Sequence, residues 1–272
     1  MNKENCRYFS GRDGLCYTQL CSCVNQFFGI DECDEKDCLK DHEQVEFINT
    51  IFLGDCIEVM KDLPDNSVDM VLCDLPYGTT RCSWDNSIDL HILWREYKRV
   101  VKPNGAILLF AQTPFDKVLG CSNLPMLRYE WIWEKTSATG HFNAKKMPLK
   151  AHENILVFYR ALPTYNYIKT NGHARKTAHK RQILNSEVYN ANTSDTFYDS
   201  TERYPRSVLK FKSDKQTENL HPTQKPVALC EYFIATYSNE GDTILDNTAG
   251  SGTTGVACKN LNRNYILIEK DK

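Results

Sequence analysis

Several features that would direct an interpretation are missing from this sequence. No apolar run approaches the ~18 residues that a membrane-spanning helix needs, so no membrane partner is expected. The first residues, Met-Asn-Lys-Glu-Asn-Cys-Arg, include no apolar signal segment, which favours a cytoplasmic protein. An excess of positive charge is also missing, because 33 Lys and Arg stand against 35 Asp and Glu. The net charge of −2 therefore gives no direct indication of a nucleic-acid partner.

The distribution of charge is more informative than its sum. Residues 31–46 include eight acidic and two basic residues, whereas residues 145–181 include nine Lys or Arg and a single acid, Glu153. A solvated surface can produce such a run. A local basic stretch is also what contact with phosphate groups requires, and the net charge of the whole chain conceals it.

Cysteine is abundant but lacks the spacing of common zinc modules. Six of the 12 cysteines lie in the first 38 residues, and no C-x2-C pair occurs, which excludes a standard zinc ribbon or finger. In a reducing compartment, clustered thiols indicate a metal before a disulfide. We expect residues 1–45 to form a small Cys-rich appendage that could bind structural zinc through Cys6, Cys16, Cys33 and Cys38. Alternative ligands are Cys21, Cys23 and His42, and the competing interpretation is a loosely packed segment with free thiols.

Beyond residue 46 the hydrophobic pattern alternates between strands and helices. This alternation predicts an α/β protein with a mostly parallel sheet, and two consecutive strands predict antiparallel pairing near its end. Trp131 and Trp133 alternate on one of these two strands and are expected in the core. Strands are expected at residues 47–53, 68–74, 106–110, 129–134, 154–159, 243–246 and 264–268, and helices at 56–63, 89–102, 226–240 and 255–261.

Periodicity fades over residues 161–220, where Asn, Thr, Tyr, Ser and Lys dominate and ten Lys or Arg occur. A disordered linker is one interpretation. The interspersed aromatic residues favour a folded, loop-rich insert whose contacts are external. These aromatic residues are Tyr165, Tyr167, Tyr189, Phe197, Tyr198, Tyr204 and Phe211.

The first chemical motif follows the strand predicted at 68–74. The apolar run ends in Asp74-Leu75-Pro76-Tyr77, followed by Gly78. Pro76 cannot donate to a strand ladder, so the strand must end there. A carboxylate, a carbonyl and an aromatic ring are thus expected at the carboxyl end of a parallel strand, where open α/β sheets bind their ligands.

The second motif is glycine-rich. Gly250-Ser251-Gly252-Thr253-Thr254-Gly255 fits G-x-G-x-x-G between a strand and a helix, and Glu269 follows Gly250 by nineteen residues. This arrangement satisfies the dinucleotide fingerprint, so a nicotinamide-dependent oxidoreductase is one interpretation. Asp246, just before the loop, would repel a pyrophosphate. Its carboxylate suits instead the ammonium or sulfonium group of S-adenosylmethionine.

Together these motifs resemble the beta group of DNA amino-methyltransferases. Asp74-Leu75-Pro76-Tyr77 is similar to the group's Asp-Pro-Pro-Tyr, and residues 221–226 are similar to its His-Pro-Thr-Gln-Lys-Pro segment. The motif order, with the cofactor loop last, is also that of the group. The resemblance spans residues 49–269. Asp246-Asn247-Thr248-Ala249-Gly250 departs from the usual Asp-Pro-Phe-x-Gly.

The resemblance implies a Rossmann-like methyltransferase sheet with a circularly permuted motif order. A catalytic domain is expected over residues 46–160 and 221–272, interrupted by a target-recognition insert at 161–220. The implied cofactor is S-adenosylmethionine. Its methionine part would lie beside Gly250, Ser251 and Gly252. Thr253 or Thr254, together with Lys225, would contact the methionine carboxylate, Asp246 the positive charge and Glu269 the ribose. Asp55 either caps a helix or accepts from the adenine amino group.

The resemblance also implies a reaction. A methyl group would pass to N6 of an adenine flipped out of double-stranded DNA, with N4 of cytosine as the alternative target. Asp74 and the Leu75 carbonyl would hold the amine, Pro76 would shape the turn, and Tyr77 would stack on the base. An Asp that leads this tetrapeptide is typical of the adenine enzymes. Lys145–Lys150 and the 161–220 insert are the expected DNA-reading surface. A bacterial or phage restriction–modification enzyme that can form a homodimer is expected.

Overall fold

The computed structural model describes residues 47–78, 88–180, 196–212 and 224–270. The chain divides into two units, residues 1–47 and 48–272, and every described helix and strand belongs to the second unit. Among the described residues, no helix is long and apolar enough to cross a membrane. The elements are β1 (Thr50–Leu53), α3 (Cys56–Asp62), β2 (Val68–Cys73), α4 (Leu90–Val100), β3 (Val101–Ala111), α5 (Phe115–Ser122), β4 (Leu127–Thr139), η2 (His141–Asn143), β5 (Lys150–Phe158), β6 (Lys176–Lys180), β7 (Thr196–Ser200), β8 (Val208–Phe211), α6 (Val227–Tyr237), β9 (Thr243–Asp246), α7 (Thr253–Asn260) and β10 (Asn264–Glu269).

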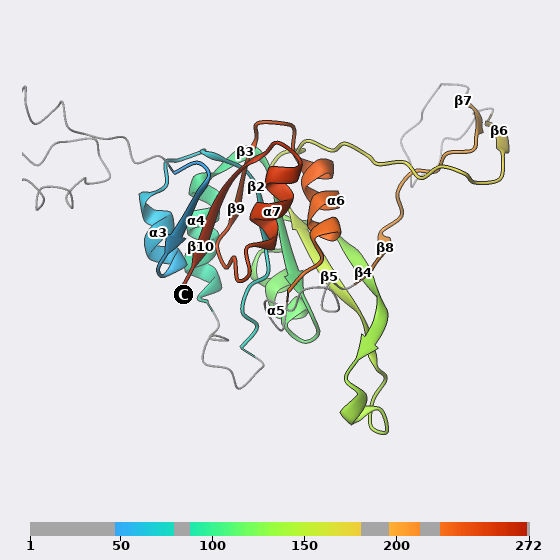
Figure 1. Cartoon of the computed structure of the whole chain (residues 1–272). Coiled ribbons are helices and arrows are strands. Elements are labelled where there is room, and N and C mark those ends of the chain that lie inside the picture. The colour runs from blue at the N-terminus through green and yellow to red at the C-terminus, as the bar shows by residue number, and fades with distance from the viewer. Residues whose placement is uncertain (1–46, 79–87, 181–195, 213–223, 271–272) are drawn as a thin grey trace, which may run out of the picture. The chain divides into compact units, whose positions relative to one another are not determined.

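The described residues form an eight-stranded sheet in the order β1-β10-β9-β2-β3-β5-β4-β8 (Figure 1). Every neighbouring pair is parallel except the two that involve β5, so β5 alone runs against the rest. The predicted α/β class, with a mostly parallel Rossmann-like sheet and one antiparallel strand, is confirmed. β9 and β2 are adjacent although more than 160 residues separate them in the sequence. The cofactor loop predicted at the end of the chain therefore lies beside the motif predicted near its start.

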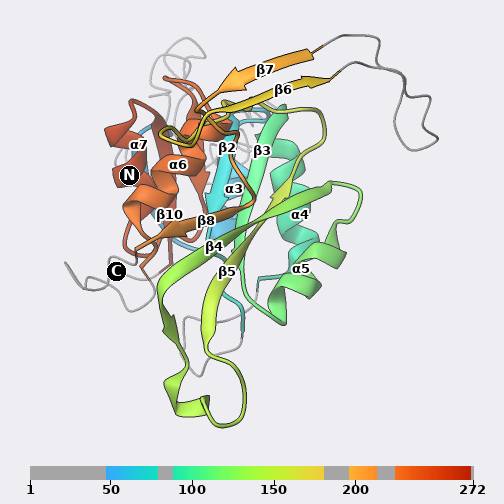
Figure 2. The ribbon, with the colours of Figure 1, turned by 90° about the vertical axis from the view of Figure 1, so that its right-hand side faces the viewer.

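Helices cover both faces of the sheet. Figure 2 shows α6 and α7 on one side and α4 and α5 on the other. Alternate residues of β2 point to opposite faces, and β2 is buried along nearly its whole length, as expected for a central parallel strand. On the α6 side, Phe110 packs edge-to-face on Phe233 with ring centroids 6.4 Å apart. On the α4 side, the Trp94 and Phe158 rings lie 4.8 Å apart. Trp131 and Trp133 are buried in the core, as predicted.

Local signals account for the helix starts. Asp55 and Asp89 are the N-caps of α3 and α4, and their carboxylates accept from backbone N–H groups two or three residues later. The helix expected at 89–102 ends earlier, at Val100, and β3 begins directly at Val101 rather than at residue 106. Residues 103–105, which lie between the expected helix and the expected strand, are therefore part of β3. An added Cβ on Gly105 would lie 2.7 Å from the Asp69 carbonyl oxygen, so glycine serves a close strand contact here.

Part of the predicted insert belongs to the main sheet. β8 pairs in parallel with β4, while β6 and β7 form a separate antiparallel ribbon. Near that ribbon, the Tyr167 and Tyr204 rings lie 5.1 Å apart and Lys169 lies over Tyr204. Tyr167 and Tyr204 thus pack on each other within the insert, whereas Tyr165 and Phe211 pack on Tyr237 and Tyr232 of α6.

Candidate functional site

Four carboxylates occupy one edge of the sheet because four neighbouring strands end there. Asp74 follows β2, Asp246 ends β9, Glu269 ends β10, and Asp55 lies two residues beyond β1. The registers fix this alignment, since Leu267 pairs with Asp246 and Leu53 pairs with Glu269. The residues that the two motifs predicted at a carboxyl edge therefore lie together at one edge of the sheet.

Asp246 is a buried carboxylate that uses neutral donors only. Its side chain accepts from the Thr254 hydroxyl at 2.6 Å and from the Thr248 N–H at 3.2 Å. Among the described residues it forms no ion pair. Burial raises its pKa to about 6 against the partial compensation of these hydrogen bonds. A positively charged ligand beside Asp246 would relieve the cost of this buried charge.

The glycine-rich turn connects β9 to α7. Gly250 and Gly252 have φ of 52° and 75°, in the left-handed region that favours glycine. An added Cβ on either residue would have no atom within 4 Å, so the turn borders open space. At Gly255 a Cβ would lie 2.7 Å from Leu267 Cδ1, which shows how closely α7 packs on β10. The three glycines thus combine a tight turn, an open flank and close helix–sheet packing.

The polar residues of the turn contact one another and Glu269. The Gly250 N–H donates to Glu269 Oε2 at 2.6 Å, and the hydroxyls of Ser251 and Thr253 lie 3.1 Å apart. Thr254 is turned toward Asp246. Glu269 is thereby brought to the glycine turn, as its spacing predicted.

Asp55 acts as a helix cap in this structure. Its Oδ1 accepts from the Ile57 N–H at 3.0 Å, and its Oδ2 lies 3.9 Å from Lys270 Nζ. The capping interpretation of Asp55 is confirmed. A ligand contact would use the other carboxylate oxygen, because Oδ1 already accepts from the helix.

Asp74 is fixed at both carboxylate oxygens. The Tyr77 hydroxyl donates to Oδ1 at 2.7 Å, and Lys225 Nζ donates to Oδ2 at 2.5 Å. The Asp74 backbone carbonyl accepts from the Thr248 hydroxyl at 2.9 Å. Leu75 is buried, and Pro76 is half-buried beside it. Asp74 itself keeps 27% of its side chain exposed, so a ligand can reach it.

Tyr77 combines a stacking face with a fixed hydroxyl. Its ring stacks on Phe115, with centroids 5.0 Å apart and 24° between the planes. Burial, reinforced by Asp74 and Glu153, raises the pKa of Tyr77 well above its ordinary value, so the hydroxyl stays a donor. Phe115 was missed in the sequence because nothing around it marks a contact with Tyr77.

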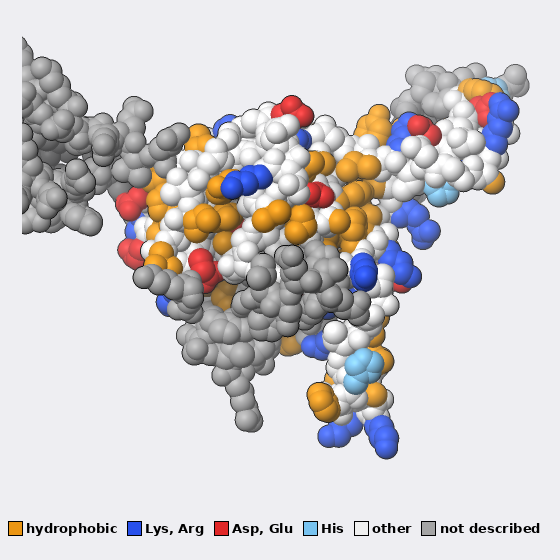
Figure 3. All heavy atoms as spheres, in the orientation of Figure 1, with side chains coloured by type: hydrophobic (Ala, Val, Ile, Leu, Met, Phe, Trp, Pro, Cys, Tyr) orange, Lys and Arg blue, Asp and Glu red, His pale blue; other side chains and the backbone are white. Residues whose placement is uncertain are grey.

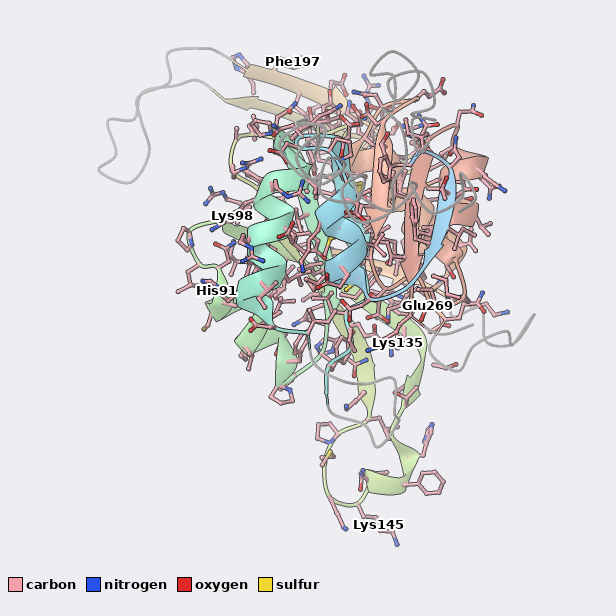
Figure 4. All side chains as sticks on the ribbon, turned by 90° about the vertical axis from the view of Figure 1, so that its left-hand side faces the viewer. His91, Lys98, Lys135, Lys145, Phe197 and Glu269 are labelled. Atoms are coloured by element: carbon pink, nitrogen blue, oxygen red, sulfur yellow. The ribbon has the colours of Figure 1, made fainter. Side chains whose placement is uncertain are left out.

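Two further charged residues, Glu153 and Lys135, extend the ion pair between Asp74 and Lys225. Lys225 lies 3.2 Å from Glu153, and Lys135 lies 2.5 Å from the other oxygen of Glu153. Glu153 reaches this edge because β5 is antiparallel, which places the start of β5 beside the ends of its neighbours. In Figure 4, Lys135 and Glu269 are seen toward the same end of the sheet. Sequence reasoning missed Glu153 and Lys135. Their positions just outside the two predicted strands 129–134 and 154–159 were the available signal.

Thr248 connects the two motifs. It occupies the position where the resemblance leads one to expect Phe, and its N–H donates to Asp246 while its hydroxyl donates to the Asp74 carbonyl. Its hydroxyl also lies 2.9 Å from Cys73 Sγ. The departure from the family pattern therefore replaces an aromatic edge with a polar link between the two strands.

The predicted metal ligands Cys6, Cys16, Cys33 and Cys38 lie outside the described residues, as do residues 221–223. Within the described residues, no group of three or more His, Cys, Asp or Glu side chains could hold a metal ion. Zinc therefore has no support in this structure, and the prediction of a zinc site stays untested at those four positions.

Comparisons with known proteins agree with this geometry. Residues 68–272 match a family model described as DNA methylase, for N6 and N4 methyltransferases. The type II methyltransferase M.HinfI of Haemophilus influenzae is 28% identical over 258 residues, covering 84% of this chain and 66% of that protein. The DNA adenine methyltransferase YhdJ of Escherichia coli is 32% identical over 241 residues, covering 81% of this chain and 78% of that protein.

Solved structures of DNA methyltransferases are similar to this chain in fold. The M1.HpyAVI–SAM complex has a TM-score of 0.56 and 26% identity, covering 82% of this chain and 93% of that chain. The cytosine-N4-specific PvuII DNA methyltransferase has a TM-score of 0.58 at 15% identity, covering 82% of each chain, which shows a shared fold.

Proposed function

Because this chain belongs to the N6/N4 DNA amino-methyltransferase family, we propose that it transfers a methyl group from S-adenosylmethionine to N6 of adenine in DNA. The observation that carries this proposal is Asp74, an accessible carboxylate fixed at both oxygens at the carboxyl end of β2. Similarity to relatives named type II methyltransferases supports a place in a restriction–modification system. Membership of this family leaves the nicotinamide-dependent oxidoreductase without support.

The residues around the glycine turn fit the cofactor. Asp246 is buried without an ion-pair partner among the described residues, which suits a cationic ligand. The open flank at Gly250 and Gly252 leaves room for its methionine part, and the turn lies at the start of α7. Glu269 would accept from the ribose hydroxyls and Asp55 from the adenine amino group. When bound, the cofactor supplies an electrophilic methyl group. The match to the M1.HpyAVI–SAM complex supports this assignment.

Asp74 and Leu75 act on the base. The lone pair of an exocyclic amine is delocalised into the ring, so the amine is a weak nucleophile. Hydrogen bonds from its two hydrogens to the Asp74 carboxylate and the Leu75 carbonyl favour the tetrahedral nitrogen and stabilise the positive charge that develops there. Tyr77 offers its ring to the flipped base and holds Asp74 through its hydroxyl. The nitrogen–carbon bond would form as the sulfur–methyl bond of the donor breaks, and the amine proton would then leave through Asp74 to solvent.

Adenine is favoured over cytosine by two observations. The tetrapeptide begins with Asp74, and the adenine-specific relative YhdJ is 32% identical to this chain. The cytosine-N4-specific structure shares the fold at 15% identity, which carries no argument about the target. N4 of cytosine stays the second candidate because the same two acceptors could hold its amine.

A basic arm supports DNA as the substrate. The arm consists of the extended ends of β4 and β5 and their connection, residues 135–152, and no Asp or Glu occurs within it. Residues 139–152 are all exposed, and the Phe142 side chain is wholly so. Figure 4 shows Lys145 at the tip of the arm, and Figure 3 shows basic and apolar side chains gathered there. The last residues of β4, Glu134 to Thr139, extend the arm by roughly 17 Å from the site edge. A two-stranded ribbon of this kind fits a DNA groove.

The direct test supplies labelled S-adenosylmethionine and unmethylated bacterial DNA, then identifies the modified nucleoside by mass spectrometry. N6-methyladenine is the expected product. N4-methylcytosine would keep the mechanism and overturn the target. Absence of any methylated nucleoside, with protein shown to bind the cofactor, would contradict the proposal that DNA is the acceptor.

A further inference from the structure

Four charged side chains of alternating sign form a row that ends at the reaction site. Lys135 contacts Glu153 at 2.5 Å, Glu153 lies 3.2 Å from Lys225, and Lys225 contacts Asp74 at 2.5 Å. The side chains of Lys135, Glu153 and Lys225 are 10%, 6% and 12% exposed. Two positive and two negative charges give this row a net charge of zero. Buried charges are costly, so the pairing must be nearly complete for the row to persist.

We propose that Lys225 and Glu153 are positioning residues for the methyl-transfer site. Lys225 fixes the Asp74 carboxylate, and Glu153 cancels the positive charge of Lys225 at the place where the substrate amine becomes positive. This inference rests on the proposed function, and it moves Lys225 from the methionine carboxylate, where the resemblance put it, to Asp74.

The ammonium group of Lys225 contacts residues on, or directly after, three strands of the sheet. Lys225 lies two residues before α6, and its ammonium lies 5.1 Å from the centre of the Phe110 ring on β3. Its acidic partners come from β5 and from the end of β2. Because Lys225 donates to Oδ2 of Asp74 and Tyr77 donates to Oδ1, the carboxylate plane cannot rotate without losing a hydrogen bond. Each Asp74 oxygen keeps a further lone pair that the substrate amine can use.

Glu153 is needed because Lys225 alone would oppose the reaction. An ammonium 2.5 Å from Asp74 cancels most of the negative potential of that carboxylate. The methyl donor is a cation, and the attacking amine becomes one. Burial favours the neutral form of Glu153, but Lys225 and Lys135 outweigh it and hold the pKa of Glu153 below its ordinary value. The Oε2 atom of Glu153 lies near Lys225 without an aligned hydrogen bond, so it acts there mainly through its charge.

The charge of this row can be measured without any reaction. S-adenosylmethionine bears a sulfonium cation, and S-adenosylhomocysteine has a neutral sulfur in its place. The ratio of their dissociation constants, obtained by calorimetry, therefore reports the potential at the reaction site. Glu153→Gln should weaken S-adenosylmethionine relative to S-adenosylhomocysteine by about fivefold, and Lys225→Met should shift the ratio about fivefold the other way. The double variant restores the net charge and should restore the ratio.

Methyl transfer separates positioning from charge. In a single turnover, methyl transfer by the double variant should be at least about a hundredfold slower than by the wild type. The reason is that Asp74 has lost its hydrogen bond from Lys225. Lys225→Arg should recover part of that rate. Lys102→Met is the matched control: Lys102 pairs with Asp69 at 2.6 Å on neighbouring strands, near the starts of β2 and β3 and away from the site, and its side chain is 41% exposed. This control should change neither the ratio nor the rate.

Opposite shifts in the two single variants would support the inference, since a general loss of packing weakens both ligands alike. Equal ratios in wild type and both variants would overturn it, as would shifts of the same sign. Binding of S-adenosylhomocysteine shows that each variant is folded, and Lys225→Gln replaces Lys225→Met if that binding is lost. Failure of the wild-type protein to bind either ligand would instead overturn the proposed function on which this inference rests.

Discussion

Asp74 and Asp246 lie at the ends of neighbouring strands and differ in their hydrogen-bond partners and their burial. Asp74 is partly exposed and receives a lysine and a tyrosine from the protein itself. Asp246 is 5% exposed and receives only neutral donors, which leaves its pKa raised to about 6 by burial. In the proposed function, the first carboxylate acts on a neutral amine and the second, which has no cationic partner among the described residues, contacts the positive charge of the cofactor. Thr248 donates to both residues and ties the two sites together.

The largest expected effect comes from removing the reactive carboxylate. Asp74→Ala should lower methyl transfer by about a thousandfold, because the acceptor for the amine is lost. The loss should appear in single-turnover measurements of label transfer to DNA. Thr50→Ser serves as the control variant, because Thr50 begins β1 and so lies at the end of that strand away from the site. Turnover at the wild-type rate in Asp74→Ala would refute the assigned mechanism.

Asp246→Asn should make the free protein more stable. The pKa of Asp246 rises from 3.8 unfolded to about 6 folded, so its contribution is most favourable below pH 3.8 and is lost as pH rises through about 6. Above pH 6 the buried charge then costs up to about 3 kcal/mol, which the asparagine avoids. Denaturant unfolding of both proteins without cofactor at pH 5 and pH 8 measures this.

The gain from Asp246→Asn should be larger at pH 8 than at pH 5. A variant that is less stable at pH 8, or equally affected at both pH values, would show that Asp246 does not bear an uncompensated charge in the folded protein.

The arm provides the next largest effect. Changing Lys145 and Lys146 together to Gln should lower DNA affinity and reduce the slope of log affinity against log salt by about 2. Arg175→Gln is the comparison, because Arg175 already pairs with Asp199 through two hydrogen bonds and should change that slope less. Titrations of a DNA duplex at several salt concentrations distinguish the two. An unchanged slope in the double variant would remove the arm from the DNA interface.

The smallest effect concerns the glycine turn. Gly250→Ala should cost about 1 kcal/mol of stability, because φ is positive there although a Cβ meets nothing. Gly241 has φ of 83° and also borders open space, so Gly241→Ala should cost a similar amount. Only the change at Gly250 should weaken S-adenosylmethionine, as measured by calorimetry. Equal cofactor affinity in both variants would indicate that the ligand does not pass Gly250.

Local signals made the cofactor side of the site predictable. The strand expected at 243–246 coincides with β9, and the glycine turn follows it, although α7 begins at Thr253, two residues before the expected start. Asp74 and Tyr77 were likewise predictable, because Pro76 marks the end of β2. In each case the determining residues are close neighbours in the sequence.

The charged row could not be read from local signals. It requires that β5 run against β3 and β4 and that Trp133 pair with Glu153. Those facts depend on long-range pairing, which hydrophobic periodicity does not specify. β8 was also missed, because four residues at the edge of a sheet show too little alternation to mark a strand. Functional residues that act through a partner from another strand are therefore the ones that need a structure.

The most direct test of the central claim measures cofactor affinity and methyl transfer side by side in Asp74→Asn and Asp246→Asn. The account predicts that Asp74→Asn binds S-adenosylmethionine only about fivefold more weakly than the wild type, because one negative charge of the row is lost, but transfers little label to DNA. Asp246→Asn should lose most of its affinity for S-adenosylmethionine while it remains folded. If Asp246→Asn keeps wild-type affinity, or if Asp74→Asn loses affinity and keeps its rate, the division of labour between the two carboxylates is wrong.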